Sequence, residues 1–125
     1  MNKLLLDSNI IIGLGKNRFP MEIVQNHLSY VSEITRLEVF GYHQIKMQEE
    51  LLLNQFFGNI TCIAISKSLI DKSIKLRKEK AMCIGDAIIG ATAILEDLPI
   101  VLANIKDFQH IKGLELIDPV SIWRI

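Results

Sequence analysis

The stretch IGDAIIGATAILEDLPIVLAN, residues 84–104, contains the pattern that decides the fold. A helix is indicated by apolar residues at helical spacing, namely Ile84, Ala87, Ile88, Ala91, Ile94, Leu95 and Leu98. Ile89 and Ala93 make the other side apolar too, so we expect this helix at the centre of the protein. The run 100–102 follows and has the length and composition of a buried strand.

Short apolar runs of this kind recur along the chain and alternate with longer segments of helical spacing. The expected strands are 4–6, 30–31, 60–65, 100–102 and 114–117, and we expect them to be buried on both faces. The expected helices are 20–28, 34–57 (as two helices), 68–80 and 84–98. This alternation predicts an α/β fold with a mainly parallel central sheet of four to five strands flanked by helices. No linker-like segment interrupts it, so we expect one domain over residues 1–125.

Composition limits the classes of function that the chain can have. Its 125 residues are half apolar and carry 14 Lys+Arg against 14 Asp+Glu, which excludes a strongly basic nucleic-acid binder but not a local basic patch. The mean hydropathy is +0.30, yet no apolar run approaches the roughly 20 residues that span a bilayer. We therefore expect no membrane association, a large core and an oligomer interface. The few cysteines and the early Asp7 favour a reducing, cytoplasmic location over secretion.

Two acidic residues in the first third occupy informative positions. Asp7 directly follows the first expected strand, where an open parallel sheet collects its ligands, although a helix N-cap is its simplest structural role. Glu38 could complete a T-x-x-E capping box with Thr35. We favour a functional role for it, because a helix that starts near residue 32 would put this carboxylate on an apolar stripe with Ile34, Gly41 and Ile45.

The last third supplies further oxygen ligands. Asp86 lies in the first turn of the central helix, where the helix dipole alone would favour it. Gly85 and Gly90 flank this acid although glycine weakens a helix, which predicts that the backbone passes close to something there. Asp107 follows the fourth strand as an acidic loop residue, and Asn104 is an alternative oxygen ligand from the same loop.

These residues together place three or four oxygen ligands at one edge of one sheet. Converging carboxylates repel one another unless a cation is present, and hard oxygen ligands favour Mg²⁺ or Mn²⁺. The sequence has no zinc set, because its three histidines are isolated and it contains no Cys-x-x-Cys. A magnesium or manganese site is therefore predicted.

Four segments resemble the PIN-domain nucleases, and within them the small VapC-type toxins of type II toxin–antitoxin systems. They are LLLDSNIII, SEITRLEVFGY, IGDAIIGATAI and LANIKDF. Their order and separation match the family as well, and the resemblance covers nearly the whole chain. The resemblance implies a PIN domain that hydrolyses RNA phosphodiester bonds as a metal-dependent endoribonuclease. It also implies an antitoxin protein as partner and a homodimer, with interface residues expected among Met47, Leu51, Phe56, Phe57 and Trp123.

The resemblance implies roles for the acids as well. Asp7 and Asp86 would bind the metal directly, Glu38 would bind it or orient the attacking water, and Asp107 would act through water or at a second ion. The family commonly has Thr-x-Asp or Thr-x-Asn before its Asp-Phe pair. Here Leu102-Ala103-Asn104 lacks the threonine, so either Asn104 or Asp107 fills the fourth acidic position.

An RNA surface on a neutral protein needs a local basic patch. Residues 72–80 carry five Lys and Arg side chains and lead into the Asp86 segment, while Arg36 lies two residues from Glu38. Such a run is typical of a solvated helix face, but its place beside the acids suits phosphate binding. We hypothesise that Arg36, Lys75 and Lys78 contact RNA.

Two other functions remain open at this point. One is a catalytically weak PIN-fold module that binds RNA or acts as a scaffold, which the missing threonine at Leu102 supports. The other is a receiver-like phosphorylation switch, which is less favoured. A receiver has an acidic pair after its first strand and an aspartate after its third, whereas Ser8-Asn9 follows Asp7 and residues 63–66 contain no acid.

Overall fold

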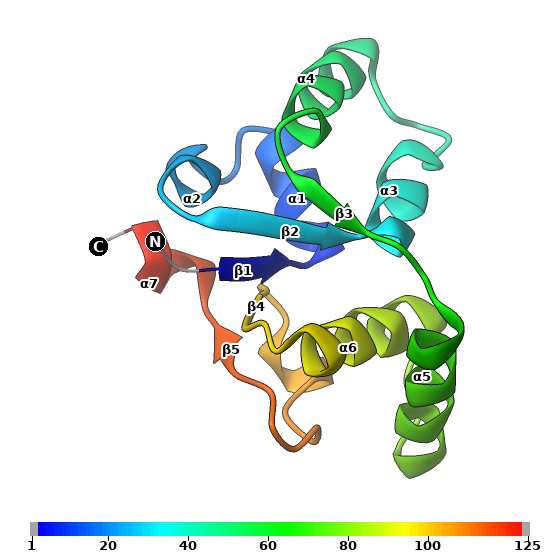
Figure 1. The fold of residues 1–125 in the computed structure, drawn as a ribbon. Coiled ribbons are helices and arrows are strands. Elements are labelled where there is room, and N and C mark those ends of the chain that lie inside the picture. The colour runs from blue at the N-terminus through cyan, green and yellow to red at the C-terminus, as the bar shows by residue number, and fades with distance from the viewer. Residues whose placement is uncertain (1–2, 124–125) are drawn as a thin grey trace.

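The computed structural model describes residues 3–123 and contains a five-stranded sheet. The strands are β1 (Lys3–Leu6), β2 (Leu28–Ser32), β3 (Thr61–Ile63), β4 (Ile100–Val101) and β5 (Leu116–Ile117), in the order β3-β2-β1-β4-β5 (Figure 1). Every pairing is parallel, which confirms the predicted α/β fold. The strand order reverses beside β1, and the carboxyl ends of strands at such a point are where α/β sheets bind ligands.

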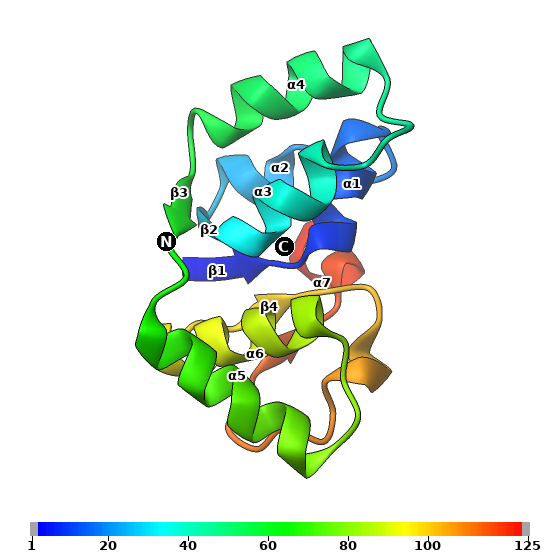
Figure 2. The same cartoon turned by 90° about the vertical axis from the view of Figure 1, so that its right-hand side faces the viewer.

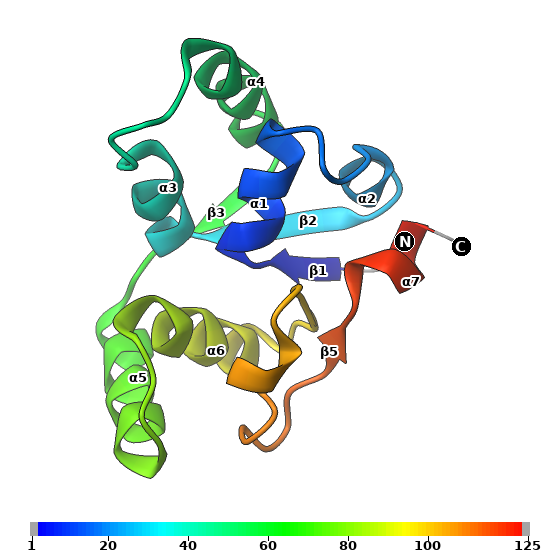
Figure 3. The same ribbon diagram turned by 180° about the vertical axis from the view of Figure 1, so that it is seen from behind.

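Helices cover both faces of this sheet (Figures 1 and 2). On one side lie α1 (Ser8–Gly15), α2 (Glu22–Gln25), α3 (Glu33–Phe40) and α4 (Met47–Phe57). On the other side lie α5 (Lys67–Glu79) and α6 (Ile84–Glu96). The 3₁₀ turn η1 (Ile105–Asp107) follows β4, and α7 (Pro119–Trp123) follows β5 and lies near α2 (Figure 3). In Figure 2 the start of α1, the first turn of α6 and η1 lie at the same edge of the sheet.

Two apolar cores form because alternate strand residues point to opposite faces. Leu4 and Leu6 pack with α1 and α4, whereas Leu5 packs with α5 and α6. The three central strands contribute residues to both cores, as predicted. The edge strands β3 and β5 are only partly buried, so the expectation that all strands are buried on both faces is wrong for these two.

Helix α1, like the short helix α7, is not predicted by the periodicity. Its sequence SNIIIGLG has three consecutive isoleucines and two glycines, all weak helix formers. Burial of Ile10, Ile11 and Leu14 in the core outweighs this weak propensity. The expected helix over 20–28 is wrong in its bounds, since α2 covers only Glu22–Gln25 and Leu28 already pairs with β1.

Helix α6 lies at the centre of the second core, as predicted. All seven residues from Ala87 to Ala93 are buried. The expected apolar stripe is wrong at two positions, because Ile84 is 60% exposed and Leu95 is 48% exposed, whereas Leu98 at its end is buried. Within residues 3–123, no helix combines the length and apolarity needed to cross a membrane.

Candidate active site

Asp7 lies deep at the carboxyl end of the central strand. Its N–H donates to the carbonyl oxygen of Val101 at 3.0 Å, which joins the end of β1 to β4. The residue takes the N-cap position of α1 and is only 4% exposed, but its side chain does not form the hydrogen bond of a helix cap. Burial, followed by repulsion from Asp86, raises the pKa of Asp7 from its ordinary value to about 6, although the amides of Asn9 and Ser8 oppose this shift.

Glu38 reaches the same place from α3. The Ser8 hydroxyl donates to Glu38 Oε1 at 2.7 Å and lies 3.0 Å from the buried hydroxyl of Thr35. Since Ser8 follows Asp7 directly, these bonds hold the carboxylate of Glu38 next to the start of α1. Glu38 is also the smallest of the causes that raise the pKa of Asp7, as expected for two carboxylates that are near each other.

The local structure around Glu38 differs from both sequence interpretations. The expected stripe is wrong, because Gly41 caps the C-terminus of α3 and Ile45 lies beyond this helix. Glu38 is exposed, and the buried residues of α3 are Thr35 and Val39. The capping box is wrong too, since the Ser32 side chain caps α3 by accepting from the N–H of Ile34. Glu38 is therefore a surface carboxylate fixed by a hydroxyl.

Asp86 projects from the first turn of α6. Cys83 caps this helix, and the Asp86 N–H donates to its Sγ at 3.4 Å. Burial, with a smaller contribution from repulsion by Asp107, raises the pKa of Asp86, although the Cys83 thiol opposes the shift. The sequence did not lead us to expect that Ser8 would hold Glu38 or that Cys83 would cap the helix of Asp86. Only the position of Ser8 beside Asp7 and that of Cys83 at the start of α6 could have indicated these roles.

A side chain at Gly85 would collide with its neighbour, and one at Gly90 would make a tight contact. A Cβ at Gly85 would be 2.7 Å from Glu38 Oε2, and one at Gly90 would be 3.1 Å from a methyl group of Ile111. The predicted close approach of the backbone is thus confirmed at both positions. Gly85 lets the carboxylate from α3 lie directly against the N-terminal turn of α6, next to Asp86.

Asp107 and Asn104 occur together at the site rather than as alternatives. Both are exposed around η1, and Asn104 Nδ2 donates to Asp107 Oδ2 at 2.5 Å. Asp107 also contributes to the raised pKa of Asp86, so it belongs to the same electrostatic cluster. The Asn104 side chain thereby holds Asp107 and keeps its own carbonyl oxygen as a second potential ligand.

The four acids form a continuous chain of repulsion from Glu38 through Asp7 and Asp86 to Asp107. Within residues 3–123, no Lys or Arg forms an ion pair with any of them. Their hard oxygen donors fit Mg²⁺ or Mn²⁺, and a cation would relieve the repulsion that their positions impose. No three of the described His, Cys, Asp and Glu side chains are grouped as a ready-made metal site, so the carboxylates would have to close in on a bound ion.

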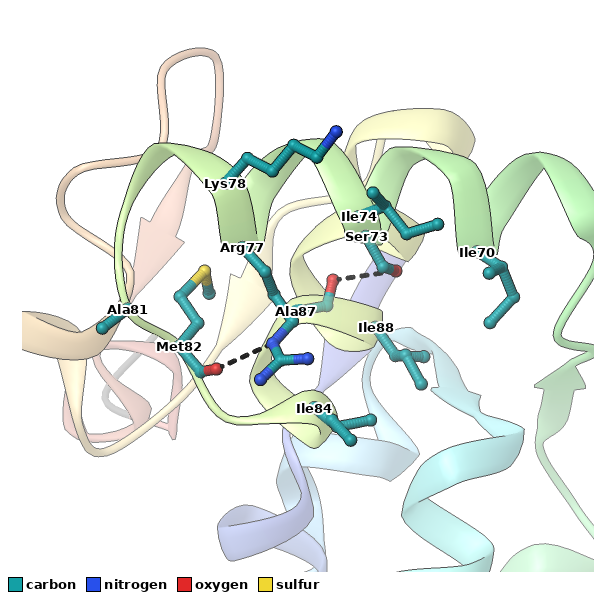
Figure 4. A pocket seen from close by; sticks show the side chains of 10 residues that line it. All are labelled: Ile70, Ser73, Ile74, Arg77, Lys78, Ala81, Met82, Ile84, Ala87 and Ile88. Carbon is teal, nitrogen blue, oxygen red and sulfur yellow. Dashed lines mark hydrogen bonds between the residues drawn. The ribbon is translucent and has the colours of Figure 1, made fainter.

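The expected RNA-contacting residues are spread over two surfaces. Arg36 Nε donates to Glu33 on the exposed side of α3. Lys78 borders a largely apolar groove between α5 and α6, and its side chain points away from the following loop (Figure 4). Lys75 is exposed on α5, the helix that also carries Lys78. Arg77 turns the other way and donates to the carbonyl oxygen of Met82 at 3.0 Å, which fixes the loop that leads to Asp86 (Figure 4).

No family model matches the sequence. Ribonuclease VapC1 from Methanocaldococcus jannaschii is 27% identical over 124 residues, which cover 94% of this chain and 88% of that protein. A solved toxin–antitoxin complex from Klebsiella pneumoniae contains a chain that is 31% identical, with a TM-score of 0.74 and coverage of 93% of this chain and 97% of that one. The chain belongs to the VapC-type PIN-domain toxins.

A further VapC structure shows the same fold at lower identity. VapBC2 from Rickettsia felis, solved with a DNA fragment from its promoter, has a TM-score of 0.78 and 24% identity over 92% of this chain and 97% of that one. That structure confirms the fold, and the Methanocaldococcus jannaschii and Klebsiella pneumoniae relatives confirm the family resemblance drawn from the sequence. In this VapC-type chain the parallel sheet brings Asp7, Asp86 and Asp107 to one edge, and Ser8 brings Glu38 to them.

Proposed function

We propose that this VapC-type chain is an endoribonuclease that uses Mg²⁺ or Mn²⁺ and acts as the toxin of a toxin–antitoxin pair. The observation that carries the proposal is the group of mutually repelling carboxylates at the carboxyl ends of β1 and β4, paired with no Lys or Arg of residues 3–123. The name of the Methanocaldococcus jannaschii relative, a ribonuclease, supports RNA as the substrate.

Asp7, Asp86 and Glu38 are the proposed metal ligands. When bound, the ion would neutralise charge on the scissile phosphate and lower the pKa of the attacking water. Ser8 occupies Oε1 of Glu38, which leaves Oε2, the oxygen against Gly85, to bind the ion or to accept a hydrogen bond from that water. Asp107, held by Asn104, is the proposed second-ion or water-mediated acid.

An antitoxin is the proposed protein partner, because the Klebsiella pneumoniae relative was solved in a toxin–antitoxin complex. Helix α4 offers apolar side chains for this interface or for a homodimer, since Met47 is 77% exposed and Leu51 is 60% exposed. Phe56 is buried in the core and Phe57 is half-buried against it, so neither supplies such a surface. The side chain of Trp123 lies outside the described residues.

The proposal is tested by cleavage of a labelled single-stranded RNA with purified protein and Mn²⁺. Asp7→Asn and Asp86→Asn should each abolish cleavage, while Asp71→Asn, on the exposed side of α5, should retain it. Equal cleavage by wild type and both site variants would overturn the assignment. A catalytically weak RNA-binding module would bind the RNA without cutting it in any of these proteins.

Metal binding has its own measurement. Mn²⁺ should raise the Tm of the wild-type protein by mass action, and Asp86→Asn should remove most of that gain.

We also propose that Lys75 and Lys78 bind distal parts of the RNA strand. Their joint reversal to glutamate should therefore lower RNA affinity and weaken its salt dependence, and an unchanged affinity would place the strand elsewhere.

A further inference from the structure

A second cavity opens from the acidic cluster. Asp86 and Asp107 form part of the wall of a pocket of about 350 Å³ between the α5–α6 connection and η1. Its remaining wall includes Lys80 and Cys83 from that connection, and Lys106 and His110 from the segment around η1. The volume is at the lower end of the range for sites that enclose a small ligand.

The two lysines in this pocket are available to an anion. Neither Lys80 nor Lys106 forms an ion pair with an acid of residues 3–123, although Asp86 and Asp107 line the same cavity. The two cations come from separate segments of the chain, Lys80 from the α5–α6 connection and Lys106 from η1. Lysine ammonium groups bind phosphate oxygens as mobile point charges.

His110 is the second observation that points to a ligand. Both of its ring nitrogens are buried, and neither has a hydrogen-bond partner within the part of the chain that the structure describes. Buried polar atoms in native proteins are normally satisfied, and those without a protein partner are satisfied by water or by a ligand. Because this histidine lines the pocket, rotation of its imidazole would bring a ring nitrogen within hydrogen-bonding reach of a molecule held there.

The wall that carries Lys80 is held in place before any ligand binds. Arg77 Nε donates to the Met82 carbonyl (Figure 4). The Cys83 side chain caps α6 by accepting from the Asp86 N–H. Hydrogen bonds therefore hold this connection at Met82 and at Asp86. A pocket with a fixed wall loses less conformational entropy on binding than one that must first become ordered.

We infer that this pocket binds the nucleotide next to the scissile phosphate, with Lys80 and Lys106 on its phosphate and His110 donating a hydrogen bond to it. The inference rests on the proposed function and extends it. A free small anion would be repelled by Asp86 and Asp107, whereas a phosphate that belongs to a strand already held at the acidic cluster is brought into the pocket by the covalent chain. An RNA strand therefore suits this mixture of charges better than a soluble anion does.

The test uses the full chain and a labelled single-stranded RNA. In otherwise wild-type protein with Mn²⁺, Lys80→Ala/Lys106→Ala should raise KM about tenfold and leave kcat within about threefold, because the lysines hold substrate and not the reacting atoms. In the Asp7→Asn background, the same pair should lower RNA affinity and reduce the slope of log affinity against log salt by about 1.4. Lys46→Ala/Lys67→Ala, two exposed lysines on other elements, is the matched control and should change neither value by more than about twofold.

His110 is tested by rescue. His110→Ala should raise KM several-fold, and His110→Gln, which keeps a donor, should recover part of that loss at an unchanged Tm. If the lysine pair leaves KM and affinity at wild-type values while the wild type cleaves RNA, the inference fails and the proposed function stands. If the wild type neither binds nor cleaves RNA, both fail.

The two cysteines allow an independent measurement. Cys83 lines the pocket and is exposed, whereas Cys62 is half-buried in the edge strand β3. In Asp7→Asn protein, bound RNA should slow alkylation of Cys83 at least fivefold and leave Cys62 unaffected. Equal rates at Cys83 with and without saturating RNA would place the nucleotide outside the pocket.

Discussion

The two halves of the acidic cluster are built in opposite ways. Asp7 is a buried residue at the end of the central strand, and the adjacent Ser8 is hydrogen-bonded to Thr35 and Glu38. Asp107 is an exposed residue on a three-residue turn, held by its neighbour Asn104. The core therefore fixes the position of Asp7, whereas one local hydrogen bond fixes the position of Asp107. The site therefore has a rigid part and an adjustable part.

The largest effect is expected at Asp7. Asp7→Asn should lower cleavage at least 100-fold, because it removes a proposed ligand that the core holds in place. The same change should raise the Tm in EDTA at pH 8. The folded-state pKa of about 6 lies above the ordinary value of 3.8, so the ionised carboxylate destabilises the fold by about 3 kcal/mol at most.

The pH dependence follows with a definite sign. The folded protein binds the Asp7 proton more tightly than the unfolded chain does, so this group's contribution to stability is present below about pH 4 and is lost as the pH rises toward 6. Chemical denaturation of metal-free protein at several pH values measures it. Asp7→Asn should flatten the curve in this window relative to Asp71→Asn, and parallel curves would contradict the buried-charge explanation.

An intermediate effect is expected at Gly85, where the rigid half meets α6. Gly85→Ala would place a methyl group 2.7 Å from Glu38 Oε2, so Glu38 must move. We expect cleavage to fall about tenfold and the Mn²⁺-induced rise in Tm to shrink. Gly58→Ala, whose Cβ would meet only ordinary contacts at 3.4 Å, is the control. Full activity of Gly85→Ala would show that the position of Glu38 is not critical.

The smallest effect is expected in the adjustable half. Asp107→Asn should lower cleavage by about threefold to tenfold and change the free energy of unfolding by less than about 0.5 kcal/mol, since the residue is exposed. Kinetics at several Mn²⁺ concentrations would show whether the loss is reversed by more metal. A loss as large as that of Asp7→Asn would erase the distinction between the two halves.

The central strands, helix α6 and the positions of the acids could be predicted from the sequence, because each depends on residues that are close together along the chain. The runs Leu4–Leu6 and Ile100–Leu102 alternate between the two cores, and Gly85 marked a close approach that the structure confirms. Helix α1 could not be predicted in the same way, since its local propensity is poor and its burial is decided by α4 and β4.

Features that depend on distant segments were inaccessible for a physical reason. The bond from Ser8 to Glu38 spans 30 residues, and nothing near either residue indicates it. His110 was set aside as an isolated histidine, because the pocket around it is assembled from residues 80–86 and 106–110 only after folding. A short-range pattern shows which residues form an element, whereas a tertiary contact shows what those residues meet.

The pairing of β1 gives the site an order of assembly. On one side β1 pairs with β2, and on the other Leu5 lies beside Ile100, so the sheet joins segments made at different times on the ribosome. Asp7 and Glu38 are synthesised well before Asp86 and Asp107. Contacts between residues so far apart form slowly, because a long loop must close first. The complete acidic cluster therefore forms only at the folding step in which β4 docks beside β1. Before that step the chain holds only half of its acids in place.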